Sequence, residues 1–229
     1  MKKYILKEYG SWGVMALSYL AGIIAAGRFN LKALLSLLAI SLFINSKQAF
    51  TLWVRYVDSK KSAMIFFAQI AIASFMMIGI LGEAVIKLLP YALIPVAYIL
   101  LLHLAGEHAV ITEICGFALL TLSSLIAKFV ATNMIDNRLY IAVAIFFAAS
   151  VFRVKLQLKK EFPQRVSMIL YVAFAVFAYY LIQMPVIILL PLIDNAIFSI
   201  TLYKIKLKAT GWLEVIKGMA FLVLIALFS

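Results

Sequence analysis

Acidic side chains are scarce in this sequence, and so are charged residues in general. The 229 residues include only 9 Asp and Glu beside 21 Lys and Arg, and charged residues make up 13% of the chain. Hydrophobic residues make up 66% and the mean hydropathy is +1.11, whereas roughly half of a soluble globular domain is apolar. A soluble fold of this size is therefore excluded, and lipid has to be the main solvent.

Cysteine is almost absent, because Cys115 is the only one. A disulfide framework within the chain is thereby excluded, and we interpret Cys115, inside an apolar stretch, as a packing residue. The chain also lacks a glycine-rich phosphate loop, a Gly-x-Ser-x-Gly nucleophile elbow and a His-Glu-x-x-His zinc motif. Because these patterns are absent, we predict no metal site, and the sequence identifies no particular cofactor.

Long apolar runs occupy most of the chain. Because a helix that crosses a bilayer needs about 20 mostly apolar residues, we predict one all-α domain over residues 1–229, a polytopic transmembrane bundle of about nine helices. The predicted spans are 9–27, 31–50, 62–82, 85–103, 109–133, 138–153, 166–183, 185–203 and 212–229.

The seventh and eighth spans are the hardest to separate. We predict a tight hairpin at Pro185, since proline suits the first turn of a helix, and a kink at Pro191. If 166–203 were one broken segment, there would be eight helices, and the basic residues at 204–208 would lie opposite those at 153–165. The distribution of basic residues therefore favours nine.

Basic residues are concentrated in alternate loops. With a cytoplasmic N-terminus, 16 of the 21 Lys and Arg, Lys217 among them, belong to the cytoplasmic side and 5 to the other side. Cytoplasmic loops carry an excess of Lys and Arg, so we predict an N-in, C-out orientation in the plasma membrane. The same rule explains the net charge of +12, and we expect no nucleic-acid partner.

Several charged side chains intrude on apolar spans near their cytoplasmic ends. Charges at membrane depth are costly and tend to face the bundle interior or an aqueous cavity. The candidate catalytic or proton-transferring residues are Glu8, Glu113 and Asp194. The candidate anion- or substrate-binding residues are Lys7, Lys47, Arg55, Arg153 and Lys155. The alternative for basic residues, favoured for outer ones such as Lys60, is that they reach the headgroups and only fix topology.

One His/Glu group contains residue types that can bind metals. His103 and Glu107 have a spacing that brings them together on a helix, with His108 and Glu113 close by in the sequence. Imidazole and carboxylate groups can bind metals. A polar turn between helices explains these residues more simply, so we predict no metal site.

Four short segments stand out along the chain. They are Leu6-Lys7-Glu8-Tyr9-Gly10-Ser11-Trp12, Thr112-Glu113-Ile114-Cys115-Gly116, Val151-Phe152-Arg153-Val154-Lys155 and Gly211-Trp212-Leu213-Glu214. Together they resemble the YwiC-like family of prokaryotic membrane proteins. The family's opening reads approximately Lys-Glu-His-Gly-Ala-Trp, and Tyr9 replaces that histidine here. The resemblance implies a multi-helix membrane protein and no particular activity.

The nine-helix, N-in plan also resembles, more distantly, the UbiA prenyltransferases. Those enzymes bind magnesium and a diphosphate through two Asp-rich motifs in loops 2–3 and 6–7. Here loop 2–3 contains only Asp58, and loop 6–7 contains Glu161 among basic residues. The resemblance implies a lipid- or isoprenoid-processing transferase, but the departure makes binding of a metal-bridged diphosphate in the usual way unexpected.

These observations leave three functional hypotheses. The first is a UbiA-like enzyme that binds an anionic lipid or isoprenoid through the basic residues. The second is a transporter or channel for a small anion, with Glu113 and Asp194 as proton carriers. The third is a non-catalytic membrane assembly subunit. Membrane lipids are expected partners in each case, and the oligomeric state is left open.

Overall fold

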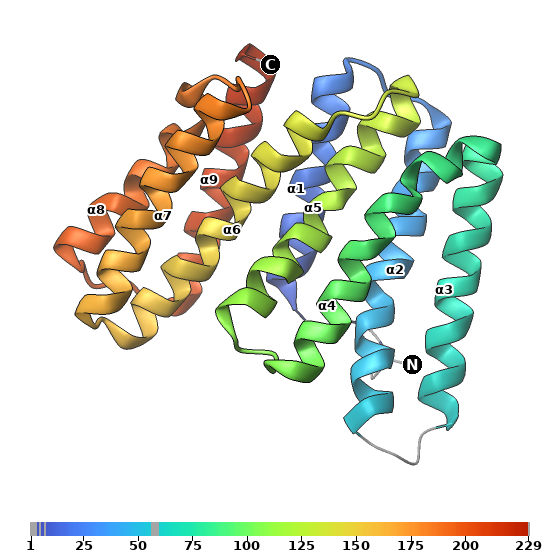
Figure 1. Ribbon diagram of the computed structural model, residues 1–229, viewed down its shortest axis with the longest axis horizontal. Coiled ribbons are helices and arrows are strands. Elements are labelled where there is room, and N and C mark those ends of the chain that lie inside the picture. The colour runs from blue at the N-terminus through green and yellow to red at the C-terminus, as the bar shows by residue number, and fades with distance from the viewer. Residues whose placement is uncertain (1–3, 5, 7, 56–59, 229) are drawn as a thin grey trace.

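The computed structural model describes residues 4, 6, 8–55 and 60–228, without the side chains of residues 54 and 55. Its elements are α1 (Tyr9–Ala26), α2 (Leu31–Arg55), α3 (Lys60–Leu81), the 3-10 segment η2 (Gly82–Ala92), α4 (Leu93–Leu104), α5 (Val110–Thr132), α6 (Asn137–Lys159), α7 (Phe162–Leu181), the 3-10 segment η3 (Val186–Leu192), α8 (Ile193–Thr201) and α9 (Leu207–Phe228) (Figure 1). The described residues contain no strand, and the predicted all-α class is confirmed.

Seven helical stretches within the described residues are long and apolar enough to cross a membrane. In the bilayer core every backbone N–H and C=O group has to be paired within the protein, which a helix achieves along its own length. The longest stretch, Lys60–Leu104, has 45 residues and combines α3, η2 and α4. The chain is a multi-pass helical membrane protein, and its apolar outer surface contacts lipid.

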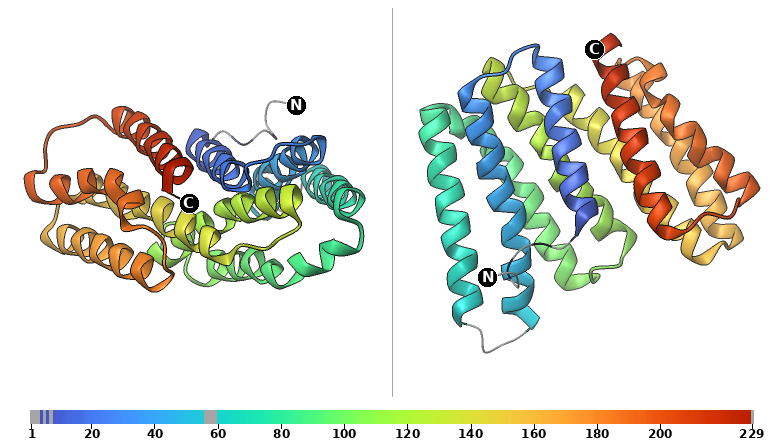
Figure 2. Two further views of the ribbon diagram at one scale, coloured as in Figure 1. Left: turned by 90° about the horizontal axis from the view of Figure 1, so that it is seen from above. Right: turned by 180° about the vertical axis from the view of Figure 1, so that it is seen from behind.

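Consecutive helices run in opposite directions. Figures 1 and 2 show that α1, α3, α5, α7 and α9 begin at the same end of the bundle, where α2, α4, α6 and α8 end. Residues with positive φ mark turns at the opposite end: Gly27 (60°), Gly82 (56°) and Gln183 (57°). The hairpin predicted at Pro185 is confirmed, because α7 ends before Gln183 and η3 begins directly after Pro185. We call the end where α1 begins the basic face, because it carries the Lys-rich turn between α6 and α7.

The sixth helix extends further than predicted. The expected span was 138–153, but α6 continues to Lys159. Arg153, at the end of the predicted span, and Gln157, beyond it, are both buried and bonded inside the protein. Internal partners therefore carry the helix past the point where hydropathy alone would end it.

Two other helices begin differently from the predicted spans. The predicted helix 85–103 begins as the 3-10 segment η2, which contains Pro90; proline has no N–H to donate to an α-helical hydrogen bond. The predicted helix 212–229 begins earlier, at Leu207. Pro191, where a kink was predicted, lies in η3 just before the chain changes to the α-helix α8.

The close crossing of α1 and α5 holds one half of the bundle together. A Cβ atom on Gly22 would lie 2.2 Å from the Ser124 backbone oxygen, so only glycine permits this approach. Ser123 Oγ also donates a hydrogen bond to the Met15 carbonyl oxygen at 3.0 Å. Small and hydroxyl side chains are typical of helix contacts in membranes because they allow backbones to approach closely.

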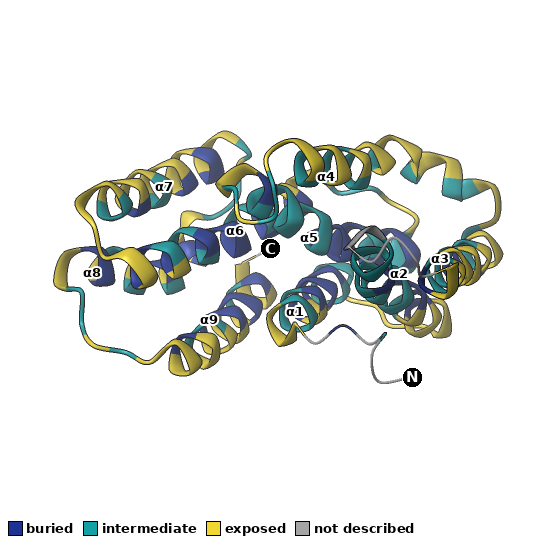
Figure 3. Ribbon diagram, turned by 90° about the horizontal axis from the view of Figure 1, so that it is seen from below, coloured by how far each residue is buried: buried dark blue, intermediate teal, exposed yellow. Residues whose placement is uncertain are grey.

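The two halves of the bundle meet at α6. This helix contacts α5 and α1 on one side and α7, α8 and α9 on the other, and Figure 3 shows it between them. It is the most buried of the long helices, whereas the stretch formed by α3, η2 and α4 is the most exposed. The buried face of α6 is thus shielded from lipid, and such a position is where a membrane protein tolerates charge.

Candidate functional site

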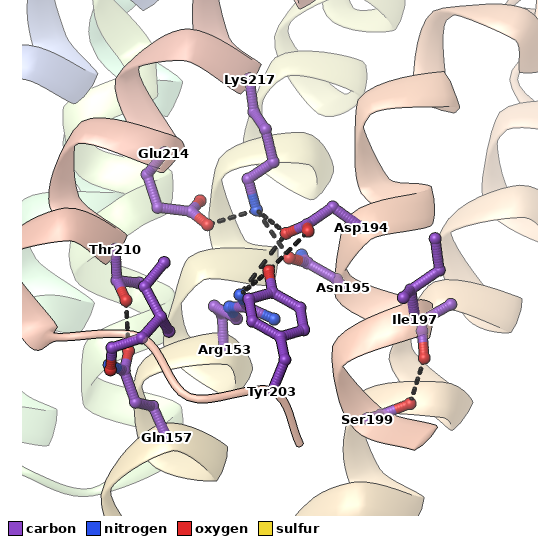
Figure 4. Close-up of polar contacts among 12 residues, drawn as sticks. Arg153, Gln157, Asp194, Asn195, Ile197, Ser199, Tyr203, Thr210, Glu214 and Lys217 are labelled. Atoms are coloured by element: carbon purple, nitrogen blue, oxygen red, sulfur yellow. Dashed lines mark hydrogen bonds and ion pairs between the residues drawn. The ribbon is translucent and has the colours of Figure 1, made fainter. Parts of the chain in front are cut away.

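A group of polar side chains bridges α6, α8 and α9 (Figure 4). It consists of Arg153 on α6, Asp194 and Asn195 on α8, Tyr203 in the link between α8 and α9, and Glu214 and Lys217 on α9. We call these six residues the Arg153 cluster. The structure places two of the predicted site residues, Arg153 and Asp194, together here.

Arg153 is fully buried (0% exposed). Its Nη2 donates a hydrogen bond to Tyr203 Oη at 2.6 Å and lies 3.6 Å from Asp194 Oδ2. The guanidinium carbon lies 3.5 Å from the centre of the Phe198 ring, a cation–π contact that partly replaces hydration. Arg153 lies six residues before the end of α6, about 9 Å along the helix axis from the basic face.

Lys217 is the deepest member of the cluster. It lies ten residues after the start of α9, which is about 15 Å along the axis, and it is 4% exposed. This lysine was counted with the basic residues of the predicted cytoplasmic side, but it lies buried within α9 and not in a loop. Its Nζ donates to Asn195 Oδ1 at 2.6 Å, forms an ion pair with Glu214 and lies 3.8 Å from Asp194 Oδ2.

Neighbouring hydrogen bonds hold the link between α8 and α9 in place. Gln157 Nε2 donates to the Ile205 carbonyl oxygen at 3.0 Å, and Gln157 Oε1 accepts from Thr210 Oγ1 at 2.6 Å. Arg165 donates to the carbonyl oxygens of Ser199 and Ile200 at the C-terminal end of α8, where a cation also complements the helix dipole. These contacts fix Tyr203 over Arg153.

The charges of the cluster balance, but its hydrogen bonds are incomplete. With both carboxylates ionised, Asp194 and Glu214 offset Arg153 and Lys217. Within the described chain, Arg153 Nε and Nη1 and Asn195 Nδ2 have no acceptor, and Asp194 Oδ2 accepts no hydrogen bond. Nearly all buried polar atoms in native proteins are paired. Unpaired donors on two fully buried side chains therefore favour a binding role.

Tyr203 forms hydrogen bonds with both Arg153 and Asp194. Its hydroxyl accepts from Arg153 and donates to Asp194 Oδ1 at 2.7 Å. Burial raises the pKa of Tyr203, and the hydrogen bond to Asp194 raises it further, while Arg153 opposes the shift without cancelling it. The phenol is therefore protonated at neutral pH and can act as the donor to Asp194.

A second ion pair joins the start of α1 to α2. Lys47 Nζ lies 3.0 and 2.9 Å from the two carboxylate oxygens of Glu8, and Ser11 Oγ donates to Glu8 at 2.8 Å. Partial burial raises the pKa of Glu8, but the hydrogen bond and charge of Lys47, with help from Ser11, lower it more. Glu8 and Lys47, both predicted site residues, thus form a separate, partly exposed pair.

A third ion pair joins α5 to α6. Lys155 Nζ lies 3.0 Å from Glu113 Oε2 and donates to the His108 carbonyl oxygen at 2.9 Å. Lys155 is two residues beyond Arg153, so it leaves α6 on a different face. The predicted residue Lys155 therefore faces α5, where it meets the predicted residue Glu113, away from the Arg153 cluster.

The remaining predicted residues cannot be placed in any of these groups. Lys7 lies outside the described residues, and Arg55 ends α2 with its side chain outside them. Conversely, Lys217 and Tyr203 were not among the predicted site residues. Lys217 carried a usable signal, a charge in the middle of an apolar helix, whereas Tyr203 carried none, since tyrosine is common at membrane interfaces.

Metal ligands do not gather in the described part of the chain: no three His, Cys, Asp or Glu side chains there are placed to hold a metal ion. The structure therefore offers binding chemistry based on cations, amides and carboxylates.

Comparison with known proteins yields no match to a family model, a curated protein or a solved structure.

Proposed function

We propose that this protein is a membrane-embedded, lipid-processing enzyme that binds the charged headgroup of a lipid or isoprenoid at the Arg153 cluster. The observation that carries the proposal is the pair of fully buried side chains, Arg153 and Asn195, with unpaired N–H groups inside a membrane bundle. Arginine is suited to phosphate and carboxylate because it stays charged and presents several donors in fixed geometry.

The depth of the cluster suits a headgroup. Arg153 is about 9 Å and Lys217 about 15 Å from the basic face along their helices, so the site extends from the headgroup region toward the hydrocarbon. A lipid could place its polar end there while its tail lies against apolar helix surfaces. A water-soluble substrate would gain no such benefit.

The packing beyond the cluster supports an enzyme over a channel. Towards the opposite end of the bundle, α6, α9 and η3 pack through apolar side chains, among them Phe146, Phe147 and Phe221. The rings of Phe146 and Phe221 stack with their centres 3.9 Å apart. This apolar core separates the cluster from the opposite face, so access from the basic face is favoured.

Asp194 is the best candidate for proton transfer among the predicted carboxylates. It lies in the cluster and accepts a hydrogen bond from Tyr203, whereas Glu8 and Glu113 are each bound to a lysine elsewhere. A carboxylate within hydrogen-bond reach of the substrate can act as a general acid or base. In this proposal Arg153 and Asn195 bind the headgroup, and Asp194 transfers the proton.

In this proposal the chain crosses the plasma membrane nine times, and its N-terminus lies in the cytoplasm. The shortest crossing, η3 with α8, has 7 and 9 residues, which at 3-10 and α-helical rises cover about 27 Å, close to the hydrocarbon thickness of about 30 Å. A C-terminal alkaline phosphatase fusion should be active and a green fluorescent protein fusion dark; the reverse result would refute the orientation.

The suspected YwiC-like and distant UbiA-like relationships also remain proposals. The segments that carry the first resemblance contribute interacting residues: Glu113 pairs with Lys155, and Arg153 and Glu214 belong to one cluster. Contacts among distant segments support a common role for them. The site uses no Asp-rich motif, so any likeness to UbiA enzymes concerns architecture.

The binding proposal can be tested on purified protein. Native mass spectrometry after mild extraction should detect a co-purified lipid or isoprenoid with a charged headgroup in the wild type. Arg153→Gln should lose it, because the buried donors are removed. The matched control Lys159→Gln removes an exposed cation from the end of the same helix and should retain it. Equal retention by both variants would refute the proposal.

A transporter is the second candidate, and one observation favours it. The chain changes from η3 to α8 next to Pro191, directly before Asp194 and Asn195, and broken helices at membrane depth are typical of transporter binding sites. Anion flux into proteoliposomes that Asp194→Asn abolishes would favour transport. Absence of flux together with Arg153-dependent lipid binding would favour the enzyme.

A further inference from the structure

The formal charge of the Arg153 cluster limits what it can bind. Two cations and two carboxylates already offset one another, as Lys217 pairs with Glu214 and both cations lie within 3.8 Å of Asp194 Oδ2. A simple anion added to this buried, neutral group would bring an uncompensated negative charge into a medium of low dielectric constant, which is strongly unfavourable. A ligand that carries both signs avoids that cost.

The unpaired atoms are also of two kinds. Arg153 Nε and Nη1 and Asn195 Nδ2 are donors, whereas Asp194 Oδ2 is a negatively charged acceptor without a hydrogen bond. The donors match the oxygens of a phosphate or carboxylate. The acceptor matches an N–H donor, and an ammonium group would satisfy both its charge and its hydrogen-bonding capacity.

The other charged groups that face the cluster do not alter this balance. α6 contributes Arg153, α8 contributes Asp194, α9 contributes Glu214 and Lys217, and the link contributes the neutral phenol of Tyr203. Glu214 is further occupied by Ser150, whose Oγ donates to its Oε2 at 2.6 Å. Lys155, the next cation on α6, is bound to Glu113. The further lysines of the link and the start of α9, Lys204, Lys206 and Lys208, are exposed and within the described chain form no ion pair with Asp194 or Glu214, so the buried cluster itself contains no cation beyond Arg153 and Lys217.

We infer that the ligand of the Arg153 cluster is a zwitterionic headgroup, a phosphate or carboxylate joined to an ammonium group, with the anionic part on Arg153 and Asn195 and the ammonium on Asp194. This inference rests on the proposed function and sharpens its substrate class. The same chemistry occurs on an aminophospholipid and on free phosphoethanolamine, and the cluster's position inside the membrane favours the lipid.

The test compares headgroups on identical acyl chains. Purified protein in detergent is titrated with dioleoyl phosphatidylethanolamine, dioleoyl phosphatidylglycerol and dioleoyl phosphatidic acid, and with soluble phosphoethanolamine and inorganic phosphate, and binding is followed by native mass spectrometry. We expect the ethanolamine lipid to bind about tenfold more tightly than the two anionic lipids, because only it keeps the cluster neutral. The soluble compounds should bind more weakly, since they lack the tail.

Charge variants give the sharper result. Asp194→Asn is nearly isosteric and leaves the cluster with a net positive charge, so the preference should reverse in favour of the anionic lipids. Glu214→Gln should shift it in the same direction, which provides a second variant if the first fails to fold. Lys159→Gln, on the exposed end of α6, should leave the wild-type order unchanged.

The outcomes separate this inference from the proposed function. Arg153-dependent binding in which anionic lipids are preferred by the wild type overturns the zwitterionic assignment and leaves the lipid site standing. If soluble phosphoethanolamine binds as tightly as the ethanolamine lipid, the ligand of the cluster is the soluble compound and not the lipid. Absence of Arg153-dependent binding for every probe overturns the proposed function itself.

Discussion

Replacing Gly22 by alanine should separate α1 from α5. The added Cβ would lie 2.2 Å from the Ser124 backbone oxygen, and the two helices would have to move apart by about 0.8 Å to bring that contact to 3.0 Å. A backbone oxygen inside a helix cannot rotate away as a side chain can. We therefore expect a cost at the upper end of overpacking effects, about 3 kcal/mol, measured as the loss of unfolding free energy in a detergent titration.

Two other glycines provide matched controls for this experiment. A Cβ on Gly218 would meet the flexible Leu17 Cδ1 at 2.6 Å, and one on Gly79 would meet nothing within 4 Å. Gly218→Ala should therefore cost about 1 kcal/mol, and Gly79→Ala should be neutral or stabilise α3 by up to about 1 kcal/mol through helix propensity. If Gly22→Ala unfolds at the same denaturant concentration as Gly79→Ala, the close crossing of α1 and α5 is refuted.

Three further predictions concern the charged groups. Lys217→Met should cost about 3 kcal/mol because it removes a buried cation from beside the partly buried carboxylates of Asp194 and Glu214, and the double variant with Glu214→Gln should recover part of that loss in the same unfolding assay. Tyr203→Phe should cost about 1–2 kcal/mol by removing one hydroxyl that bridges two ions, without a change in helix content by circular dichroism. The lowered pKa of Glu8 means that its pair with Lys47 stabilises the fold above the ordinary glutamate pKa of 4.5 and that this contribution disappears as the pH falls through the lower folded-state pKa. Because the pair is partly exposed, the difference between wild type and Glu8→Gln should stay below about 1 kcal/mol at pH 7 and vanish in acid; a difference that grows in acid would contradict it.

Hydropathy predicted where the helices lie because membrane helices depend on a local property, the length of an apolar run. The hairpin at Pro185 could be predicted for the same reason, since Gln183, Met184 and Pro185 interrupt the apolar run locally. The end of α6 could not be predicted. Its last turns are stabilised by residues far along the chain, such as Tyr203 and Thr210, and no local pattern reports such partners.

The candidate site was predicted as one group of charges, and the structure divides it into three. The residue types were informative, because carboxylates near the ends of apolar spans did find cationic partners: Glu8 with Lys47, Glu113 with Lys155 and Asp194 with Arg153. The pairing itself depends on helix rotation, which hydropathy does not specify. The burial of Lys217 was not predicted, because a count of basic residues on each side of the membrane gives no information on burial.

The wide spacing of the cluster along the chain has a consequence for biosynthesis. Arg153 precedes its nearest partners, Asp194 and Tyr203, by 41 and 50 residues, which a ribosome adds in about 2–10 s. During that interval α6 carries a cation without the partners that surround it in the folded protein, and a charge at membrane depth is costly. We therefore expect α6 to reach its final depth only once α8 and α9 are present, and a nascent chain halted after α7 to be held at the insertion machinery or degraded. The residues that form the site thus also determine when the second half of the bundle can assemble.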